Sequence, residues 1–322
     1  MITLAADFGG RRIKLGLVRN GEVIGQDILP AEADQPLTER LPVVADALDR
    51  LCAKRHIASE QRCGIGFSYP SIIDTRAARI MDHFGKFGDA SALDLRAWAE
   101  ERMGLPLAID NDARMALIGE WRHGAGRGSD NVAIITLGTG VGVSAVIEGV
   151  VLRGVHGQAG ILGGHTTVRY GGRSCVCGNI GCAEAEASTT VLERLAREDG
   201  EFATSSLATE QTIDYAVLFR AAKSGDCLGQ RLTQHTLQVW SALAVNLIHV
   251  FDPEVLILGG GVMNGADVIL PAVRDYVAKH AHTPWGQVRI VASELGDKAA
   301  LVACEWLVNE FLKERDEAVQ LR

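Results

Sequence analysis

The chain has 322 residues, 47% hydrophobic and 22% charged, with a formal net charge of −8, and this length suits two domains better than one simple core. The lack of a basic block argues against nucleic acid as a partner, because binding to phosphate backbones needs a basic face. No signal peptide and no apolar run of the roughly 18 residues that span a membrane is visible, so we expect a cytoplasmic protein with no membrane partner.

The first predicted elements, in residues 2–29, are a strand, a glycine turn, a second strand, a tight Asn20-Gly21 turn and a third strand. Asn-Gly is a strong signal for a two-residue hairpin. Residues 131–153 repeat this plan, with their tight turn at Glu148-Gly149. Two copies of one plan suggest two related domains.

Between the copies, helical periodicity at residues 36–55 and 92–104 alternates with short apolar strands at 63–69 and 105–110. This alternation predicts an α/β architecture. Asn111-Asp112 then opens a helix that continues to about residue 123. The glycine-rich stretch 123–131 looks like a linker.

The second half is predicted to be mostly helical up to Asp252-Pro253, which ends a long helix. Strands at 255–261 and 288–293 follow, and a helix closes the chain. We therefore expect a first domain at 1–122 and a second at 123–304. The C-terminal helix, about 305–322, is expected to pack back on the first domain.

Three glycine turns, at residues 7–12, 137–142 and 258–262, each follow an apolar strand. Glycine lets backbone N–H groups approach a phosphate without a Cβ in the way. Tight turns also use glycine for structural reasons, so one such turn is weak evidence. Three of them favour a nucleotide cleft between the domains, although none has the P-loop or dinucleotide-binding spacing.

Three of the seven cysteines lie within eight positions, at Cys175, Cys177 and Cys182, shortly after His165. The scattered placement of the other four suggests a reducing compartment rather than a disulfide framework. One imidazole and three thiols match a closed structural zinc site, which would make the loop 165–184 rigid without activating water. The alternative is a small redox cluster or a set of buried cysteines.

Asp112 has two interpretations. Aspartate is a favoured helix N-cap, and Asp112 stands where a helix begins. Taken alone, this position favours the cap; the functional alternative is that Asp112 faces a cleft and accepts a proton from a hydroxyl group. The residues alone leave both open.

Together these stretches resemble the ROK family of sugar kinases and repressors over nearly the whole chain. The Gly-His spacing before the cysteines and the segment 295–304 also match the family. The motifs that carry the resemblance are Asp-x-Gly-Gly at Asp7, the pair Asn111-Asp112, Leu-Gly-Thr-Gly-Val-Gly at 137–142, and the highly specific signature Cys-x-Cys-Gly-x-x-Gly-Cys-x-Glu at 175–184.

The resemblance implies an α/β, actin-like ATPase fold (ribonuclease H-like, hexokinase-type) with duplicated domains, an interdomain cleft and a homodimeric assembly. It implies ATP with Mg²⁺ as phosphoryl donor and a hexose, or an amino or N-acetylamino hexose, as acceptor. By position, Asp112 becomes the catalytic base for a sugar hydroxyl, usually that on C6. The other implied site residues are Asn111, His165 and Glu184 for the sugar, His165, Cys175, Cys177 and Cys182 for structural Zn²⁺, and Asp7, Gly9, Gly10, Gly138, Thr139, Gly140, Gly260 and Gly261 for the nucleotide.

The sequence departs from the family pattern at three places. The family's Glu-x-Gly-His reads Leu162-Gly163-Gly164-His165, so leucine replaces a carboxylate that offers strong hydrogen bonds. The usual threonine of the first glycine turn is replaced in Arg11-Arg12, which either contacts a phosphate or points to solvent. The usual Pro-Gly is Pro70-Ser71. These changes argue against plain glucose as the sole substrate.

The leading function is therefore ATP-dependent sugar phosphorylation. A non-catalytic sugar sensor is an alternative, motivated by Leu162 and opposed by Asp112, the loop 137–142 and Glu184. A ROK-type repressor is expected less, because such proteins carry a DNA-binding winged helix before the sugar domain. Here the first glycine turn already begins at Asp7.

Overall fold

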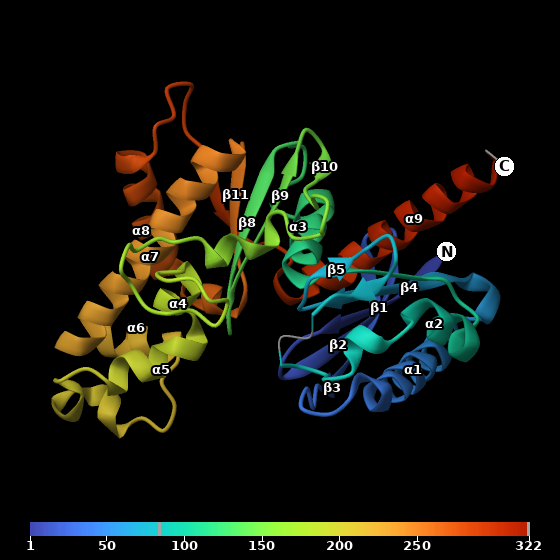
Figure 1. The fold of residues 1–322 in the computed structure, drawn as a ribbon, viewed down its shortest axis with the longest axis horizontal. Coiled ribbons are helices and arrows are strands. Elements are labelled where there is room, and N and C mark those ends of the chain that lie inside the picture. The colour runs from blue at the N-terminus through green and yellow to red at the C-terminus, as the bar shows by residue number, and fades with distance from the viewer. Residues whose placement is uncertain (83–84, 321–322) are drawn as a thin grey trace. The chain divides into compact units, whose positions relative to one another are not determined.

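The computed structural model describes residues 1–82 and 85–320, and the chain forms two compact units, each with its own five-stranded sheet (Figure 1). Unit 1 consists of residues 1–127, 153–159 and the chain from 297 onward. Unit 2 consists of residues 128–152 and 160–296. The chain therefore passes from one unit to the other four times.

Unit 1 has a sheet in the order β3-β2-β1-β4-β7, in which β1 pairs antiparallel with β2 and parallel with β4. Strand β7 extends the parallel part beside β4. The strands and helices of unit 1 are β1 (Ile2–Phe8), β2 (Arg12–Arg19), β3 (Glu22–Pro30), α1 (Leu37–Lys54), β4 (Arg62–Tyr69), β5 (Ile73–Asp74), β6 (Arg79–Ile80), α2 (Leu95–Met103), β7 (Leu107–Asn111), α3 (Asp112–His123) and α9 (Ala299–Gln320).

Unit 2 repeats this plan with a sheet in the order β10-β9-β8-β11-β12. Its hairpin strand β9 pairs antiparallel with β8, and β8, β11 and β12 run parallel. The strands and helices of unit 2 are β8 (Val132–Leu137), β9 (Val141–Ile147), β10 (Val150–Val151), α4 (Ala183–Ala187), α5 (Thr189–Arg197), α6 (Tyr215–Lys223), α7 (Cys227–Phe251), β11 (Val255–Gly259), α8 (Ala266–His280) and β12 (Arg289–Ala292).

The two predicted hairpins have the backbone that their sequences require. Asn20 and Gly21 both have positive φ, 54° and 77°, as do Glu148 and Gly149, at 51° and 73°. Two successive positive φ values produce the turn whose twist matches that of the flanking strands. The duplicated β-hairpin plan expected from the sequence is therefore confirmed.

The unit boundaries of the structure differ from those expected at 122–123 and 304–305. The first crossing falls at 127–128, after α3 and the turns that follow it, and α9 joins unit 1 from its first residue. The segment 153–159, expected in the second domain, belongs to unit 1. Residues 321–322 of the expected C-terminal helix lie outside the described residues.

Two glycines of β4 allow α9 to lie directly on the sheet of unit 1. A Cβ on Gly64 would lie 2.7 Å from Val308 Cγ1, and a Cβ on Gly66 would lie 2.4 Å from Cys304 Cβ. Because side chains alternate along a strand, Ile65 and Phe67 point to the other face, where they join the core that includes α1. The sheet is thus covered on both faces.

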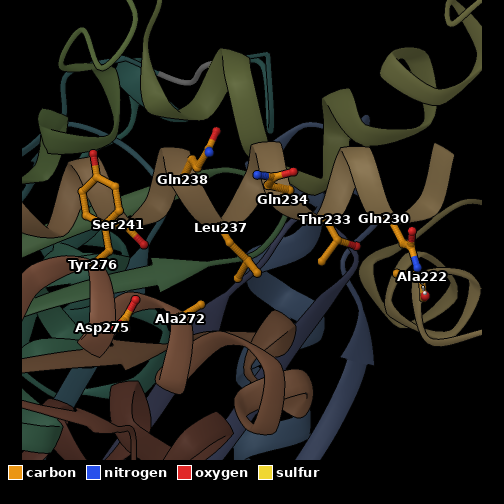
Figure 2. A pocket seen from close by; sticks show the side chains of 10 residues that line it. All are labelled: Ala222, Gln230, Thr233, Gln234, Leu237, Gln238, Ser241, Ala272, Asp275 and Tyr276. Atoms are coloured by element: carbon orange, nitrogen blue, oxygen red, sulfur yellow. Dashed lines mark hydrogen bonds between the residues drawn. The ribbon is translucent and has the colours of Figure 1, made fainter. Parts of the chain in front are cut away.

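Unit 2 contains a pocket of about 370 Å³ bordered by α6, α7 and α8 (Figure 2). None of the residues that the sequence analysis connects with chemistry lines it. The lining residues are Ala222 of α6, Gln230, Thr233, Gln234, Leu237, Gln238 and Ser241 of α7, and Ala272, Asp275 and Tyr276 of α8.

Among the described residues, no helix combines the length and the apolar character that crossing a membrane requires.

Because β4 and α9 are in close contact, adding a side chain at this contact should destabilise the protein. We expect Gly66→Ala to lower the free energy of unfolding by about 1–3 kcal/mol, because the added methyl group overpacks this contact. Gly88→Ala is the matched control, since a Cβ there meets no atom within 4 Å. Urea unfolding of both variants checks this, and equal stability of the two would contradict the packing argument.

Candidate functional site

The polar residues of unit 1 gather where its parallel strands end. Asp7 of β1 is opposite Ser68 of β4 in the sheet, and Tyr69 of β4 is opposite Asn111 of β7. The carboxyl ends of parallel strands are the usual place for ligands in open α/β sheets. Asp7, Asn111 and Asp112, far apart in the sequence, are therefore brought to one edge of the sheet.

Asp7 is held by two neighbours. Its Oδ1 accepts a hydrogen bond of 2.7 Å from Ser68 Oγ, and its Oδ2 lies 3.4 Å from Lys14 Nζ. Lys14 Nζ is also 3.0 Å from Asp297 Oδ1. Burial alone would lower the pKa of Lys14, but the charges of Asp7 and Asp297 outweigh it and raise this pKa. Lys14 thus stays charged and bound to its two partners.

Lys14 is not among the residues expected from the motifs, although the sequence contains a signal for it. In the β1–β2 hairpin, Asp7 is directly opposite Lys14. Opposite charges at facing positions of antiparallel strands attract. Pairing the residues of the two strands outward from the glycine turn places Asp7 opposite Lys14.

The helix α3 is capped by Asn111 rather than by Asp112. Asn111 Oδ1 accepts hydrogen bonds from the backbone N–H groups of Ala113 and Arg114, at 3.0 and 3.2 Å. Its Nδ2 donates to Ser71 O and to Asp112 Oδ1, both at 3.0 Å. A primary amide has two donors and two acceptor positions, so Asn111 is fully engaged within unit 1.

Asp112 is the first residue of α3 and has one oxygen free. Its Oδ1 accepts from Asn111 Nδ2 and from the N–H of Ala113, the latter at 2.8 Å. No hydrogen bond to Oδ2 is found among residues 1–82 and 85–320. The interpretation of Asp112 as the N-cap is therefore wrong, because the preceding residue makes the cap.

The carboxyl group of Asp112 is harder to ionise than an ordinary aspartate. Burial, and next the charge of Asp7, raise the pKa of Asp112 from 3.8 to about 6. The N–H of Ala113, the charge of Lys86 and the amide of Asn111 act in the opposite direction. A carboxylate with a pKa near 6 is well suited to accept a proton near neutral pH.

A buried network of ion pairs fixes the backbone at the end of β7, directly before Asn111 and Asp112. Asp110 and Arg114 are fully buried and form an ion pair. The other oxygen of Asp110 accepts from Arg153 Nε and Nη2 at 3.0 and 2.8 Å, and Asp110 Oδ1 also accepts from the N–H of Asn111 at 2.8 Å. Since Arg114 Nη2 donates to Gly157 O at 3.0 Å, the network ties the segment 153–159 to β7.

One departure from the family pattern, Ser71, contacts Asn111, whereas the pair Arg11-Arg12 lies in the first glycine turn. The hydroxyl group of Ser71 donates to the carbonyl oxygen of Asp82, and the carbonyl oxygen of Ser71 accepts from Asn111. Ser71 is therefore part of the framework that supports Asn111. Arg11 and Arg12 are exposed.

In unit 2, the second and third glycine turns lie next to each other. Strands β8 and β11 are parallel neighbours, with Gly259 opposite Thr136, so the turns that follow them lie at the same edge of the sheet. A Cβ on Gly260 would lie 2.2 Å from Leu137 O, which explains glycine there by close packing. By contrast, a Cβ on Gly138 or Gly261 would meet no atom within 4 Å.

Glu184 connects the second glycine turn with the cysteine loop. Its Oε2 accepts a hydrogen bond of 2.9 Å from the N–H of Val141, and a Cβ on Gly140 would lie 2.4 Å from this oxygen. Its Oε1 is 3.9 Å from His165 Nε2. Any side chain at residue 140 would therefore displace the carboxylate of Glu184, a contact that sequence spacing does not reveal.

The predicted metal ligands His165, Cys175, Cys177 and Cys182 come together, with their ligand atoms within 4.8 Å of one another. His165 Nδ1 is 3.4 Å from Cys175 Sγ, and Cys177 Sγ is 3.7 Å from Cys182 Sγ. A zinc ion with bonds of about 2.0–2.3 Å would place its tetrahedral ligands at roughly these separations. The donor set and its geometry fit a closed structural zinc site.

The loop that carries Leu162 is fixed against β9. Residues Ile161–His165 form a short 3₁₀ helix, and a Cβ on Gly164 would lie 1.7 Å from Val141 O. Leu162 is half-buried and has no polar side-chain atom. The carboxylate that the family pattern would supply in this stretch is therefore absent from it.

Comparison with known proteins finds similarity over nearly the whole chain. A family model described as "ROK family" matches residues 3–310. A glucokinase of Halalkalibacterium halodurans is 32% identical over 319 residues, covering 95% of this chain and 94% of that protein.

Two solved structures share the fold over nearly the whole chain. A ROK hexokinase from Thermus thermophilus has a TM-score of 0.77 and 29% identity, and the match covers 98% of this chain and 100% of that one. A ROK family glucokinase from Streptomyces griseus, solved with glucose and AMPPNP, has a TM-score of 0.76 and 29% identity, with coverages of 95% and 99%. The expected actin-like, hexokinase-type fold is confirmed.

Because ionisation of Asp112 is unfavourable in the folded state, the stability difference between Asp112→Asn and the wild type should depend on pH. At pH 8, we expect Asp112→Asn to raise the free energy of unfolding by about 1–3 kcal/mol, at about 1.4 kcal/mol per pKa unit. Because the folded-state pKa lies above the unfolded value, this gain shrinks as the pH falls through 6 and vanishes near 4. Urea unfolding at several pH values measures it. Asp34→Asn, at an exposed position, is the control, and a gain independent of pH would contradict the prediction.

The cysteine loop predicts a metal-dependent stability. We expect about one zinc ion per chain, and expect Cys177→Ser to remove most of it and to lower the melting temperature, because a structural zinc site contributes folding free energy. Cys227→Ser, at an exposed cysteine outside the cluster, is the control. Metal analysis and thermal unfolding test this, and an unchanged zinc content in Cys177→Ser would contradict it.

Proposed function

Because the chain belongs to the ROK family, we propose that it is an ATP-dependent sugar kinase acting on a hexose or on an amino or N-acetylamino hexose. The observation that carries the proposal is Asp112, held by Asn111 at the strand ends of unit 1 with one free oxygen and a raised pKa. Similarity to glucokinases over nearly the full length supports it.

In this proposal Asp112 is the general base. Its free oxygen accepts the proton of a sugar hydroxyl, the C6 hydroxyl in the simplest case, while the sugar oxygen bonds to the γ-phosphorus of ATP and the bond from that phosphorus to the ADP oxygen breaks. A base in this position typically contributes about 10²–10⁴-fold to the rate. Asn111 acts by orienting Asp112, because its own amide has no free donor or acceptor. The ring-hydroxyl contact expected for Asn111 would require it to exchange one of these bonds.

We further propose that Glu184 and His165 hold ring hydroxyls of the sugar. Glu184 Oε2 is bonded to the N–H of Val141, which leaves Oε1 for a hydroxyl group. A zinc ion in the cysteine cluster would bind Nδ1 of His165 and leave Nε2 on the side of Glu184. The zinc would thus hold a sugar-binding loop in place without reacting itself.

The glycine turns would hold the nucleotide. Gly138 and Gly261 have open space beside their Cα atoms, so their backbone can be approached closely, whereas Gly260 is explained by packing against the backbone of Leu137 and Gly140 lies against the carboxylate of Glu184. We propose that Thr139, Gly9, Gly10 and Asp7 complete this site. Mg²⁺ bound with ATP would balance the phosphate charge during the transfer.

Leu162 makes the identity of the sugar the first question for experiment. A panel of glucose, mannose, fructose, allose, glucosamine, N-acetylglucosamine and N-acetylmannosamine, each with ATP, gives the answer. Turnover of any member supports a kinase. Tight binding of one member without turnover, in a folded and zinc-containing sample, would instead support a sugar sensor.

The role of Asp112 predicts how activity depends on pH. We expect kcat/KM to fall below about pH 6, because protonated Asp112 cannot accept the hydroxyl proton. Asp112→Asn should lower kcat by at least about 10²-fold and change sugar binding little. Initial rates and sugar titrations measure both effects, with Asp34→Asn as the control. Turnover near the wild-type level in Asp112→Asn would refute the assignment.

A further inference from the structure

Lys86, a residue outside all the motifs discussed above, lies against the first glycine turn of unit 1. A Cβ built on Gly10 would be 3.6 Å from Lys86 Cε and 3.8 Å from Lys86 Nζ. The ammonium group therefore lies beside a residue that has no side chain. An anion approaching the backbone of Gly10 would meet this positive charge.

The backbone of Lys86 is anchored by the residue that follows it. Phe87 is fully buried, its N–H donates to Ala33 O at 2.7 Å, and its ring lies edge-on to that of Phe8, with centroids 6.0 Å apart. Phe8 directly precedes Gly9 and Gly10 of this turn. The same contacts that bury Phe87 thus fix the place from which Lys86 reaches the turn.

Lys86 and Lys14 differ in their partners. Lys14 is bound between Asp7 and Asp297. Lys86 is half-buried, and it makes no ion pair or hydrogen bond in the part of the chain that the structure describes. Its charge nevertheless acts on Asp112, whose pKa it lowers against the effects of burial and Asp7. An uncommitted ammonium group therefore lies beside the glycine turn, and its charge also acts on the proposed base.

We propose that Lys86 binds the anionic oxygens of the γ-phosphoryl group during its transfer. This inference rests on the proposed function. As the transfer proceeds, the bond from the sugar oxygen to phosphorus forms, the bond from phosphorus to the ADP oxygen breaks, and the hydroxyl proton goes to Asp112. Lys86 keeps its proton throughout and stabilises the charge on the phosphoryl oxygens as a point charge.

The test compares two nucleotides that differ in the γ-phosphoryl group. Calorimetric titrations with Mg²⁺ and either AMPPNP or ADP are made on the wild type, Lys86→Met, Lys86→Arg and Lys54→Met. Lys54, an exposed residue at the end of α1, is the matched control. We expect Lys86→Met to weaken AMPPNP binding about tenfold or more and ADP binding less than about twofold, with Lys86→Arg in between. In the sugar assay, kcat of Lys86→Met should fall by about 10²-fold.

The outcomes separate this inference from the proposed function. If Lys86→Met binds AMPPNP like the wild type, or loses AMPPNP and ADP affinity equally, the inference is wrong even when the wild type phosphorylates a sugar. If the selective loss of AMPPNP affinity appears but no sugar is phosphorylated, the inference holds and the sugar kinase proposal fails. If the wild type binds neither nucleotide, both fail. Circular dichroism and thermal unfolding confirm that each variant is folded.

Discussion

The place and the chemistry of Asp112 depend on the side chain of Asn111. This amide caps α3, bonds to the loop carbonyl of Ser71 and donates to Asp112, so one residue fixes the start of the helix, the neighbouring loop and one oxygen of the carboxylate. Behind it, Asp110 is bonded to Arg114 and Arg153, which holds the backbone of β7 at the same point. Buried charges are tolerated here because each has a partner of opposite charge.

The environment that makes Asp112 a suitable base also lowers the stability of the folded state. Asp110 is buried with two arginines, whereas Asp112 has another carboxylate, Asp7, as the neighbour that most disfavours its charge after burial itself. Two aspartates on either side of Asn111, one at the end of β7 and one at the start of α3, thus differ in their environments. One holds the framework, and the other remains ready to take up a proton, at a cost to the folded state that such sites commonly carry.

The sequence predicted the features that depend on neighbouring residues. The hairpin turn at Asn20-Gly21, the end of α7 at Asp252 and the ligand set in the loop 165–184 all follow from local chemistry or spacing. It could not predict features that depend on contacts between distant segments. The contact of Gly140 with the carboxylate of Glu184 is one example, and the need for glycine at residue 66, which comes from Cys304, is another. The approach of Lys86 to Gly10 likewise appears only once Phe87 packs against Phe8.

The route of the chain through the two units has a consequence for how the protein is made on the ribosome. Unit 2 is complete once residue 296 has been synthesised, but unit 1 still lacks α9 at that point, although it contains the N-terminus. The β4 face that Gly64 and Gly66 keep free of side chains therefore stays uncovered while almost all of the chain emerges. Domains generally fold as units during synthesis. Unit 1, which is begun first, can therefore be completed only after unit 2. A truncated translation product would expose this face of the sheet, a surface that chaperones and proteases recognise.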